Sequence, residues 1–232
     1  MTNRRDLLLL GLGLTGVAAG WQAWVARPQP FDFELIANLP GWRKVSTGAL
    51  TQPGAATFLT IGQETTSTPR LSPEALDQAL YRVPGAPPMA VFSDFFCPFC
   101  RTLTARLSRR PDLPVTWHEL PLLGPPSEFA ARAAVAADLQ GAYADFVDAL
   151  ARRGFRPSLA HMQSVADGIG IDGMRLRRDM DGPDVAARLT ETRRAATTLG
   201  VVGTPGLTVG RTLVIGEVEL SELDRVIALE KG

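Results

Sequence analysis

The chain has little of the two residue types that most often build metal sites, because only 2 cysteines and 2 histidines occur among its 232 residues. A structural zinc site usually takes four such ligands. His118 and His161 lie far apart in the sequence, and there is no second cysteine pair. One pair also makes at most one bridge, which excludes a disulfide-rich scaffold. We therefore expect no metal site.

The sequence also lacks an excess of charge of either sign. Lysine plus arginine and aspartate plus glutamate each number 24. Nucleic-acid-binding domains usually carry a clear basic excess, so we expect no nucleic-acid partner. Residues 11–16 match the dinucleotide-binding pattern G-x-G-x-x-G, but they lie in an apolar segment that no strand precedes. We expect no cofactor.

Long apolar runs are absent except at the N-terminus. Residues 7–26 are apolar apart from Thr15 and Gln22, and Arg4 and Arg5 precede them. About 20 apolar residues can cross a bilayer as a helix, and positive charge before such a segment favours export of the residues after it. We predict that residues 1–27 are an uncleaved membrane anchor or a cleaved, twin-arginine-like signal. Both alternatives place the rest of the chain in the periplasm or an equivalent oxidising space.

The two cysteines stand close together in Cys97-Pro98-Phe99-Cys100, between an apolar stretch typical of a buried strand (89–96) and a helical pattern. Free N–H groups at a helix start stabilise a thiolate. Because thiolates attack disulfides, we predict that Cys97 is the nucleophile and Cys100 the resolving thiol. A proline after Cys97 suits a helix start and argues against inert core thiols. As a structural disulfide, so short a loop would stabilise weakly.

The remaining pattern predicts an α/β domain with a parallel sheet core, because strands and helices alternate. In chain order we expect a linker with a small element over 28–55, a strand over 56–61, a helix from Ser72 to about Tyr81, strands over 89–96 and 113–120, helices over 127–198, a hairpin over 207–215 and a helix over 219–230. Pro205, just before the hairpin, is compatible with a cis peptide bond or with an ordinary trans proline.

Together, the C-P-F-C motif after Phe95-Phe96, the long helical stretch, Gly203-Thr204-Pro205 and the final hairpin and helix resemble the DsbA-like branch of the thioredoxin superfamily. The stretch 119–127, which leads into an alanine-rich helix, is similar to that family as well. The resemblance implies a thioredoxin-like α/β domain over residues 56–232 with a helical insertion over about 127–198.

The resemblance also implies roles for individual residues. In this family the first cysteine, here Cys97, is the exposed nucleophile, and the second, here Cys100, resolves the mixed disulfide. The late proline, here Pro205, is cis and packs against the dithiol. Thr204 would offer its backbone groups to an extended client segment, a binding mode that has independent physical sense. The helical insertion would cap the site and flank a groove for clients.

Two positions depart from the family's pattern. Its strongest oxidases have a histidine between the proline and the second cysteine, where Phe99 supplies no charge. Pro98 and Phe99 tune the redox pair, so we expect a less acidic Cys97 and a less oxidising disulfide than in those members. Many relatives also bury an acid six positions before the first cysteine, where this chain has Val91. The sequence leaves open whether Asp94 takes its place.

We predict an envelope thiol-disulfide oxidoreductase that acts on exported, cysteine-containing proteins, as an oxidase and as a monomer. Reoxidation would need a membrane redox partner or another electron acceptor. One alternative is a disulfide reductase or isomerase, for example in cytochrome maturation. Another is a dithiol module that handles copper, which soft thiolates favour. Copper relays usually add a nearby His or Met ligand, and the next methionine after the pair is Met162.

Overall fold

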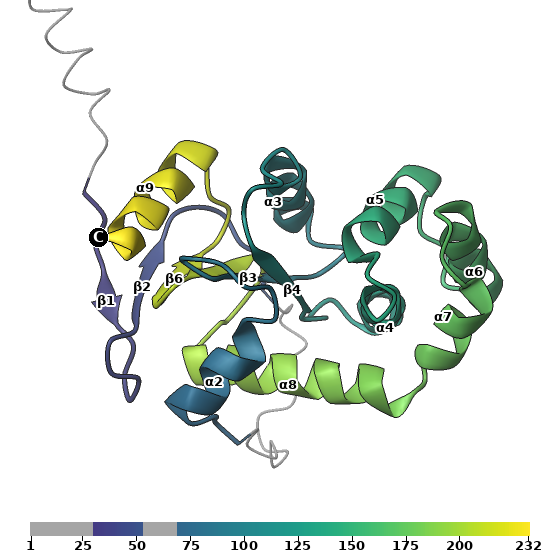
Figure 1. Cartoon of the computed structure of the whole chain (residues 1–232), viewed down its shortest axis with the longest axis horizontal. Coiled ribbons are helices and arrows are strands. Elements are labelled where there is room, and N and C mark those ends of the chain that lie inside the picture. Colours follow the sequence, from purple (N-terminus) through teal and green to yellow (C-terminus); the bar gives the residue numbers. More distant parts are fainter. Residues whose placement is uncertain (1–29, 53–68) are drawn as a thin grey trace, which may run out of the picture. The chain divides into compact units, whose positions relative to one another are not determined.

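One mixed β-sheet organises the domain (Figure 1). The computed structural model describes residues 30–52 and 69–232. Within them, the sheet has six strands in the order β1-β2-β6-β5-β3-β4. The strands are β1 (Glu34–Leu35), β2 (Arg43–Ser46), β3 (Met89–Ser93), β4 (Val115–Glu119), β5 (Gly206–Val209) and β6 (Thr212–Ile215). The expected parallel core is only partly present. β3 pairs parallel with β4, but the hairpin of β5 and β6 enters the middle of the sheet, and β5 runs antiparallel to β3.

The sheet register brings the two predicted motifs together. All five residues of β3 are buried, as expected for a central strand that both faces of the sheet cover. Phe92, near the end of β3, pairs with His118 of β4 and with Gly206, the first residue of β5. Because β3 and β5 are antiparallel, the end of one strand meets the start of the other. The loop that leads to Cys97 therefore lies beside Pro205.

Helices cover both faces of the sheet and extend beyond one edge. In Figure 1, α2 and α8 lie on one face, α3 and α9 lie on the other, and α4 to α7 gather near β4. The helices are α2 (Pro73–Leu80), α3 (Pro98–Leu107), α4 (Pro125–Asp138), α5 (Tyr143–Arg153), α6 (Leu159–Gly168), α7 (Gly173–Asp179), α8 (Pro183–Leu199) and α9 (Leu220–Lys231). The helical insertion thus runs from α4 to α8, close to the predicted range.

Local signals in the sequence explain where several helices begin. Ser72 is the N-cap of α2, where its hydroxyl accepts a hydrogen bond from the Ala75 N–H and Pro73 takes the first helical position. Ser158 and Asp172 cap α6 and α7 in the same way. These caps satisfy N–H groups that have no partner inside the helix. The predicted helix start at Ser72 is confirmed.

The hydrophobic core has two parts. One lies between the sheet, α2 and α8 and contains Trp42, Leu76 and Phe92. The other lies within the helical insertion, where buried alanines of α4 pack against larger side chains such as Phe146 and Met162. Small residues on α4 let its neighbours approach closely, while the larger side chains fill the space between them. The insertion therefore has a core of its own.

The domain begins earlier in the sequence than the predicted boundary at residue 56. Residues Phe33–Gly232 form one compact unit, and β1 and β2, within the stretch predicted as a linker and small element, belong to the sheet. β2 was not recognisable because only Val45 among its four residues is both apolar and buried. The predicted strand over 56–61 and the predicted anchor or signal over 1–27 lie outside the described residues. Within the described ranges, no helix has the length and apolar character needed to span a membrane.

Candidate active site

Cys97 occupies the position where β3 gives way to α3. It is the N-cap of α3, and its sulfur accepts a hydrogen bond from the Cys100 N–H at 3.2 Å. Its own N–H donates to the Asp94 carbonyl at 3.0 Å, which closes the turn between strand and helix. Pro98 takes the first helical position, where its missing N–H costs nothing. Both cysteines are free thiols.

The surroundings of the two thiols drive their pKa values apart. Hydrogen bonds lower the pKa of Cys97 to about 5: the contact with the Cys100 thiol contributes most, and the Thr51 hydroxyl, the Cys100 N–H and Thr204 add to it against the effect of burial. Burial raises the pKa of Cys100, and the hydrogen bond and charge of Cys97 raise it further. At neutral pH the pair thus holds a thiolate at Cys97 and a thiol at Cys100, the asymmetry that the predicted roles require.

The loop before β5 contacts the dithiol directly. The Thr204-Pro205 peptide bond is cis, as the resemblance implies. In its thiol form, Cys97 donates to the Thr204 carbonyl at 3.3 Å. The Thr204 hydroxyl is buried without a hydrogen-bond partner among the described residues. Thr204 therefore contacts the reactive sulfur through its backbone carbonyl.

Thr51 also touches the reactive sulfur, which the sequence did not predict. Its hydroxyl donates to the Cys97 sulfur at 3.2 Å, and its backbone forms an isolated antiparallel bridge with Thr204. Cys97 is 0% exposed, which corrects the expectation of an exposed nucleophile. The backbone groups of Thr204 that were expected to face a client segment are bonded to Thr51. No local motif marks Thr51, because its partners are distant in sequence.

Asp94 holds the loop that carries Cys97. Its buried carboxylate accepts hydrogen bonds from the Phe96 N–H at 2.9 Å and the Ser127 hydroxyl at 2.8 Å. The N–H groups of Leu122 and Leu123 donate to its other oxygen. Four donors satisfy a carboxylate well and tie the redox loop to the segment that leads into α4. Asp94 is therefore an anchor of the loop.

Glu119, at the end of β4, is a buried acid of a different kind. Burial raises its pKa to about 8, with the charge of Asp94 adding to this and the hydrogen bond from Tyr143 opposing it. The Tyr143 hydroxyl donates to Oε1, whereas Oε2 has no partner among the described residues. Glu119 is therefore largely protonated at neutral pH, and its Oε2 has no hydrogen-bond partner among the described residues. Neither its spacing nor its strand position identified it in the sequence.

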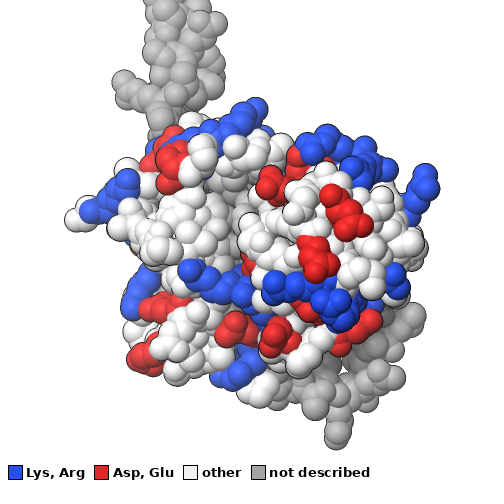
Figure 2. All heavy atoms as spheres, turned by 45° about the vertical axis from the view of Figure 1, so that its right-hand side comes forward, with Lys and Arg blue, Asp and Glu red and all other residues white. Residues whose placement is uncertain are grey.

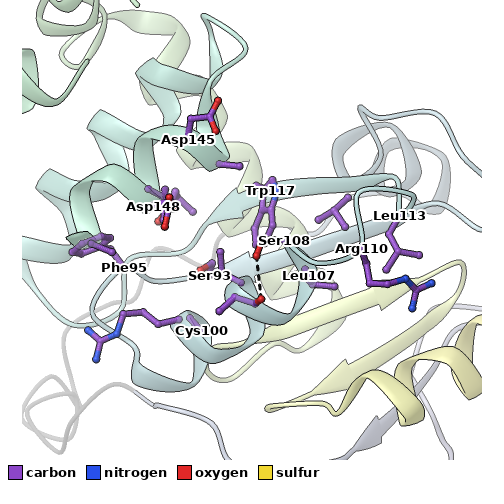
Figure 3. Close-up of a pocket in the computed structure, with 18 of the residues that line it drawn as sticks. Ser93, Phe95, Cys100, Leu107, Ser108, Arg110, Leu113, Trp117, Asp145 and Asp148 are labelled. Carbon is purple, nitrogen blue, oxygen red and sulfur yellow. Dashed lines mark hydrogen bonds between the residues drawn. The ribbon is translucent and has the colours of Figure 1, made fainter. Parts of the chain in front are cut away.

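A pocket of about 590 Å³ opens beside Cys100, between α3, β4 and α5 (Figure 3). Glu119 and Cys100 both line it, and Trp117 forms part of its wall. Asp145 and Asp148 reach it from α5. Cys97 is not among its lining residues. The dithiol thus has two distinct sides, with Cys97 under Thr51 and Thr204 and Cys100 on the pocket.

Aromatic side chains pack against one another at the redox loop, and one of them, Phe95, also lines the pocket. Phe95 and Phe96 precede Cys97 and meet Phe155 from the helical insertion, with a centroid separation of 4.8 Å between Phe96 and Phe155. All three are half-buried, as is Phe99. Phe99 brings no charge to the cysteines. The insertion therefore meets the redox loop through apolar rings.

The two histidines have other partners. His118 is buried, with its ring nitrogens on the Leu80 carbonyl and the Thr192 hydroxyl. His161 contacts the Gly154 carbonyl. No group of three or more His, Cys, Asp or Glu side chains within residues 30–52 and 69–232 is placed to hold a metal ion. The contacts that the structure shows at the Cys97 sulfur are hydrogen bonds with Thr51, Thr204 and the Cys100 N–H.

The surface of the helical insertion carries charges of both signs. Figure 2 shows Lys and Arg interspersed with Asp and Glu on the face that includes this side of the molecule. Several of the arginines pair with acids, such as Arg132 with Asp181 and Arg188 with Asp138. Such pairing leaves little unbalanced positive charge to attract an extended polyanion.

A dithiol at a strand-to-helix turn, with one thiol poised as a thiolate beside a cis-proline loop, defines a thiol-disulfide oxidoreductase of thioredoxin-like fold. A family profile described as DSBA-like thioredoxin domain matches residues 89–228. The chain belongs to this family.

Solved structures agree with this assignment. A thioredoxin-like oxidoreductase from Silicibacter pomeroyi DSS-3 is 34% identical, with 70% of this chain and 99% of that chain covered and a TM-score of 0.58. The thiol-disulfide exchange protein alpha-DsbA2 from Wolbachia pipientis is 24% identical, covering 61% of this chain and 80% of its own, with a TM-score of 0.54. BdbD from Bacillus subtilis is 16% identical, covering 67% and 94%, with a TM-score of 0.55. The last two share the fold. A search of curated protein sequences gives no match.

Proposed function

We propose that the protein is an oxidase of exported proteins, working in the periplasm or an equivalent oxidising space. The observation that carries this proposal is the set of hydrogen bonds to the Cys97 sulfur, from the Cys100 N–H and the Thr51 hydroxyl. They stabilise the thiolate, which exists only in the reduced protein. Stabilising the reduced form makes the disulfide a better oxidant.

In the proposed reaction, a client thiolate attacks the Cys97 sulfur of the enzyme disulfide. The bond between Cys97 and Cys100 breaks, and its electron pair passes to the Cys100 sulfur. A second client thiolate then attacks the client sulfur of the mixed disulfide, and Cys97 leaves as a thiolate. The client dithiol loses two electrons and the enzyme gains them. A membrane redox partner or another electron acceptor would restore the enzyme disulfide.

The first step leaves Cys100 in need of a proton, because burial raises the pKa of its thiol well above the usual range. Glu119 lines the same pocket and is protonated at neutral pH. Asp94 is unsuited to this task, because four donors hold its oxygens as acceptors. We assign the proton transfer to Glu119, through water in the pocket, in place of the acid missing at Val91.

A Cys100→Ala variant tests this function in cells. It should accumulate mixed disulfides with exported proteins through Cys97, because the resolving thiol is gone. A variant with both Cys97→Ala and Cys100→Ala is the matched control and should trap nothing. In equilibrium with glutathione, the wild-type disulfide between Cys97 and Cys100 should behave as an oxidant. A potential near that of thioredoxin would make the protein a reductase instead, and an absence of trapped clients together with stoichiometric copper binding would overturn the oxidoreductase function.

A further inference from the structure

The segment that comes after β2, residues 47–52, lies along the loops that carry the redox site. The Thr47 N–H donates to the Ile215 carbonyl at 3.1 Å, and the Glu217 N–H donates to the Ala49 carbonyl at 2.8 Å. The Thr47 hydroxyl donates to the Glu217 carbonyl at 3.0 Å. The two backbone bonds, which do not depend on the Thr47 hydroxyl, fix the path of the segment from the sheet edge to the dithiol.

The segment ends on Thr204 with a two-way backbone bridge. The Thr51 N–H donates to the Thr204 carbonyl at 2.7 Å, and the Thr204 N–H donates to the Thr51 carbonyl at 2.9 Å. Gly203 makes this approach possible, because a Cβ at that position would lie 2.5 Å from the Thr51 carbonyl oxygen and 2.6 Å from a Leu50 methyl. The fit between the segment and the loop therefore depends on residues from both.

The bridge aims the Thr51 hydroxyl at the reactive sulfur. Oγ1 lies 3.2 Å from the Cys97 sulfur, the same distance as the Cys100 nitrogen. The Cys100 N–H belongs to the helix backbone and would be present with any side chain at that position. Phe99 adds no donor. Thr51 therefore adds a hydroxyl donor to the thiolate from outside the C-P-F-C tetrapeptide, beside the Cys100 thiol and N–H.

We propose that Thr51 is a catalytic residue of this site, whose hydroxyl hydrogen bonds to the Cys97 sulfur as negative charge develops on it. In the second step of the reaction, the bond between Cys97 and the client sulfur breaks and its electron pair stays on Cys97. The Thr51 O–H donates to that sulfur without transferring its proton. The assignment deepens the proposed function and rests on it for its catalytic meaning, but the hydrogen bond itself can be measured without any client.

The test compares Thr51→Val with Thr51→Ser in the reduced, full-length protein. Valine keeps the shape and the backbone bridge but removes the hydroxyl, whereas serine keeps the hydroxyl. The absorbance of the thiolate near 240 nm is followed against pH, and the redox equilibrium with glutathione is measured beside it. The loss of one hydrogen bond to a charged group changes the acid dissociation constant of that group about tenfold. Thr51→Val should lower this constant for Cys97 about tenfold and shift the equilibrium toward the disulfide by a similar factor, while Thr51→Ser should stay within about twofold of wild type.

Thr47→Val is the matched control, because Thr47 is also half-buried and hydrogen bonded in the same segment but does not contact sulfur. It should leave the Cys97 titration unchanged. Thr51→Ala provides a second variant without the hydroxyl and should reproduce the shift if valine disturbs folding. A Cys97 titration unchanged in both Thr51→Val and Thr51→Ala, with folded protein, would overturn the proposal. If Thr51→Val and Thr51→Ala shift the Cys97 titration but Cys100→Ala traps no clients, the hydrogen bond is supported and the proposed function is refuted.

Discussion

Phe99 is the residue at which this active site lacks a charged donor. It is half-buried next to the buried pair. We predict that Phe99→His lowers the pKa of Cys97 below about 5, the value set by the present hydrogen bonds, because an imidazolium stabilises a nearby thiolate. The disulfide should become more oxidising by about tenfold in its equilibrium with glutathione, a change typical of one charge-assisted hydrogen bond. Thiolate absorbance and glutathione redox titration check both effects.

Thr102 offers a control for that substitution, since it lies on the same helix with its side chain exposed. Thr102→His adds the same group farther from the cysteines and should leave both measurements near wild type. Equal effects at Phe99 and Thr102 would mean that a general change in charge, and not a contact with the thiolate, is responsible.

Glu119 gives the reaction a distinctive pH dependence. Burial raises its pKa to about 8, so it can donate a proton below that pH and loses the ability above it. The rate at which a dithiol client reduces the enzyme disulfide should therefore fall as pH rises through 8, once ionisation of the client thiols is allowed for. Glu119→Gln should remove this step in the profile and lower the rate at neutral pH about a hundredfold, the usual size of general acid catalysis. Stopped-flow fluorescence measures the rate.

Glu34→Gln is a suitable comparison, because Glu34 is an exposed acid that pairs with Lys44 away from the dithiol. Its rate profile should match that of the wild type. A Glu119→Gln variant that keeps the wild-type profile would assign the proton transfer elsewhere.

At the level of elements, Asp94 joins the loop after β3 to the segment between β4 and α4. Asp94→Ala leaves the N–H groups of Phe96 and Leu122 and the Ser127 hydroxyl without their acceptor. Leaving buried donors without their charged acceptor lowers the free energy of unfolding much more than breaking an exposed ion pair does. We expect Asp94→Ala to lower the free energy of unfolding by about 3 kcal/mol. Urea unfolding of the oxidised protein measures it.

Asp112 provides the contrast, because its carboxylate pairs with Arg110 at the surface. Asp112→Ala should change the free energy of unfolding far less than Asp94→Ala does. A comparable loss for both substitutions would show that the network around Asp94 contributes no more than a surface pair does.

The elements that the sequence predicted well are those with a local signal. Ser72 and Pro73 mark the start of α2, and Cys97 and Pro98 mark the start of α3, because capping and the first helical position depend on neighbouring residues. The hairpin of β5 and β6 follows from alternation around Gly210. Such features need no knowledge of the rest of the chain.

The features that were missed depend on distant partners. Thr51 lies 46 positions before Cys97, and nothing in its own neighbourhood indicates that its hydroxyl contacts sulfur. Asp94 was noted as the nearest acid, but its bond to Ser127 spans 33 positions and decides its role. Burial raises the pKa of Glu119, and its hydrogen-bond partner Tyr143, which lies in the insertion 24 positions later, opposes this rise. In each case the chemistry arises from packing between elements.

Across the whole molecule, two neighbouring residues of β4 act on stability in opposite directions. Burial lowers the pKa of His118 from 6.5 to about 3, so protonation of the unfolded chain reduces stability as pH falls below 6.5. Glu119 has its pKa raised from 4.5 to about 8, so ionisation of the unfolded chain reduces stability as pH rises above 4.5 and up to about 8. The two slopes, each about 1.4 kcal/mol per pH unit, oppose each other between pH 4.5 and 6.5.

We therefore predict that the oxidised protein is most stable between pH 4.5 and 6.5, the interval in which the two contributions cancel. The oxidised form is chosen because it carries no free thiol. Denaturant unfolding at several pH values gives the profile, and Glu119→Gln should flatten it above pH 6.5 and make stability rise with pH between 4.5 and 6.5, where His118 then acts alone. A profile that keeps rising to pH 8 in the wild type would contradict the raised pKa of Glu119.

The bridge between Thr51 and Thr204 also sets the terms on which a client binds. A client strand that pairs with Thr204 has to replace a segment of the same chain, and a tethered competitor of this kind acts at an effective concentration on the order of millimolar. Such a strand would gain only the difference between its own backbone pairing and the pairing it displaced, so Thr51 keeps its place beside the Cys97 sulfur while a client reacts. Backbone recognition at Thr204 then adds little to affinity. Discrimination among clients falls to side-chain contacts, and the half-buried rings of Phe96 and Phe155 are candidates for these contacts.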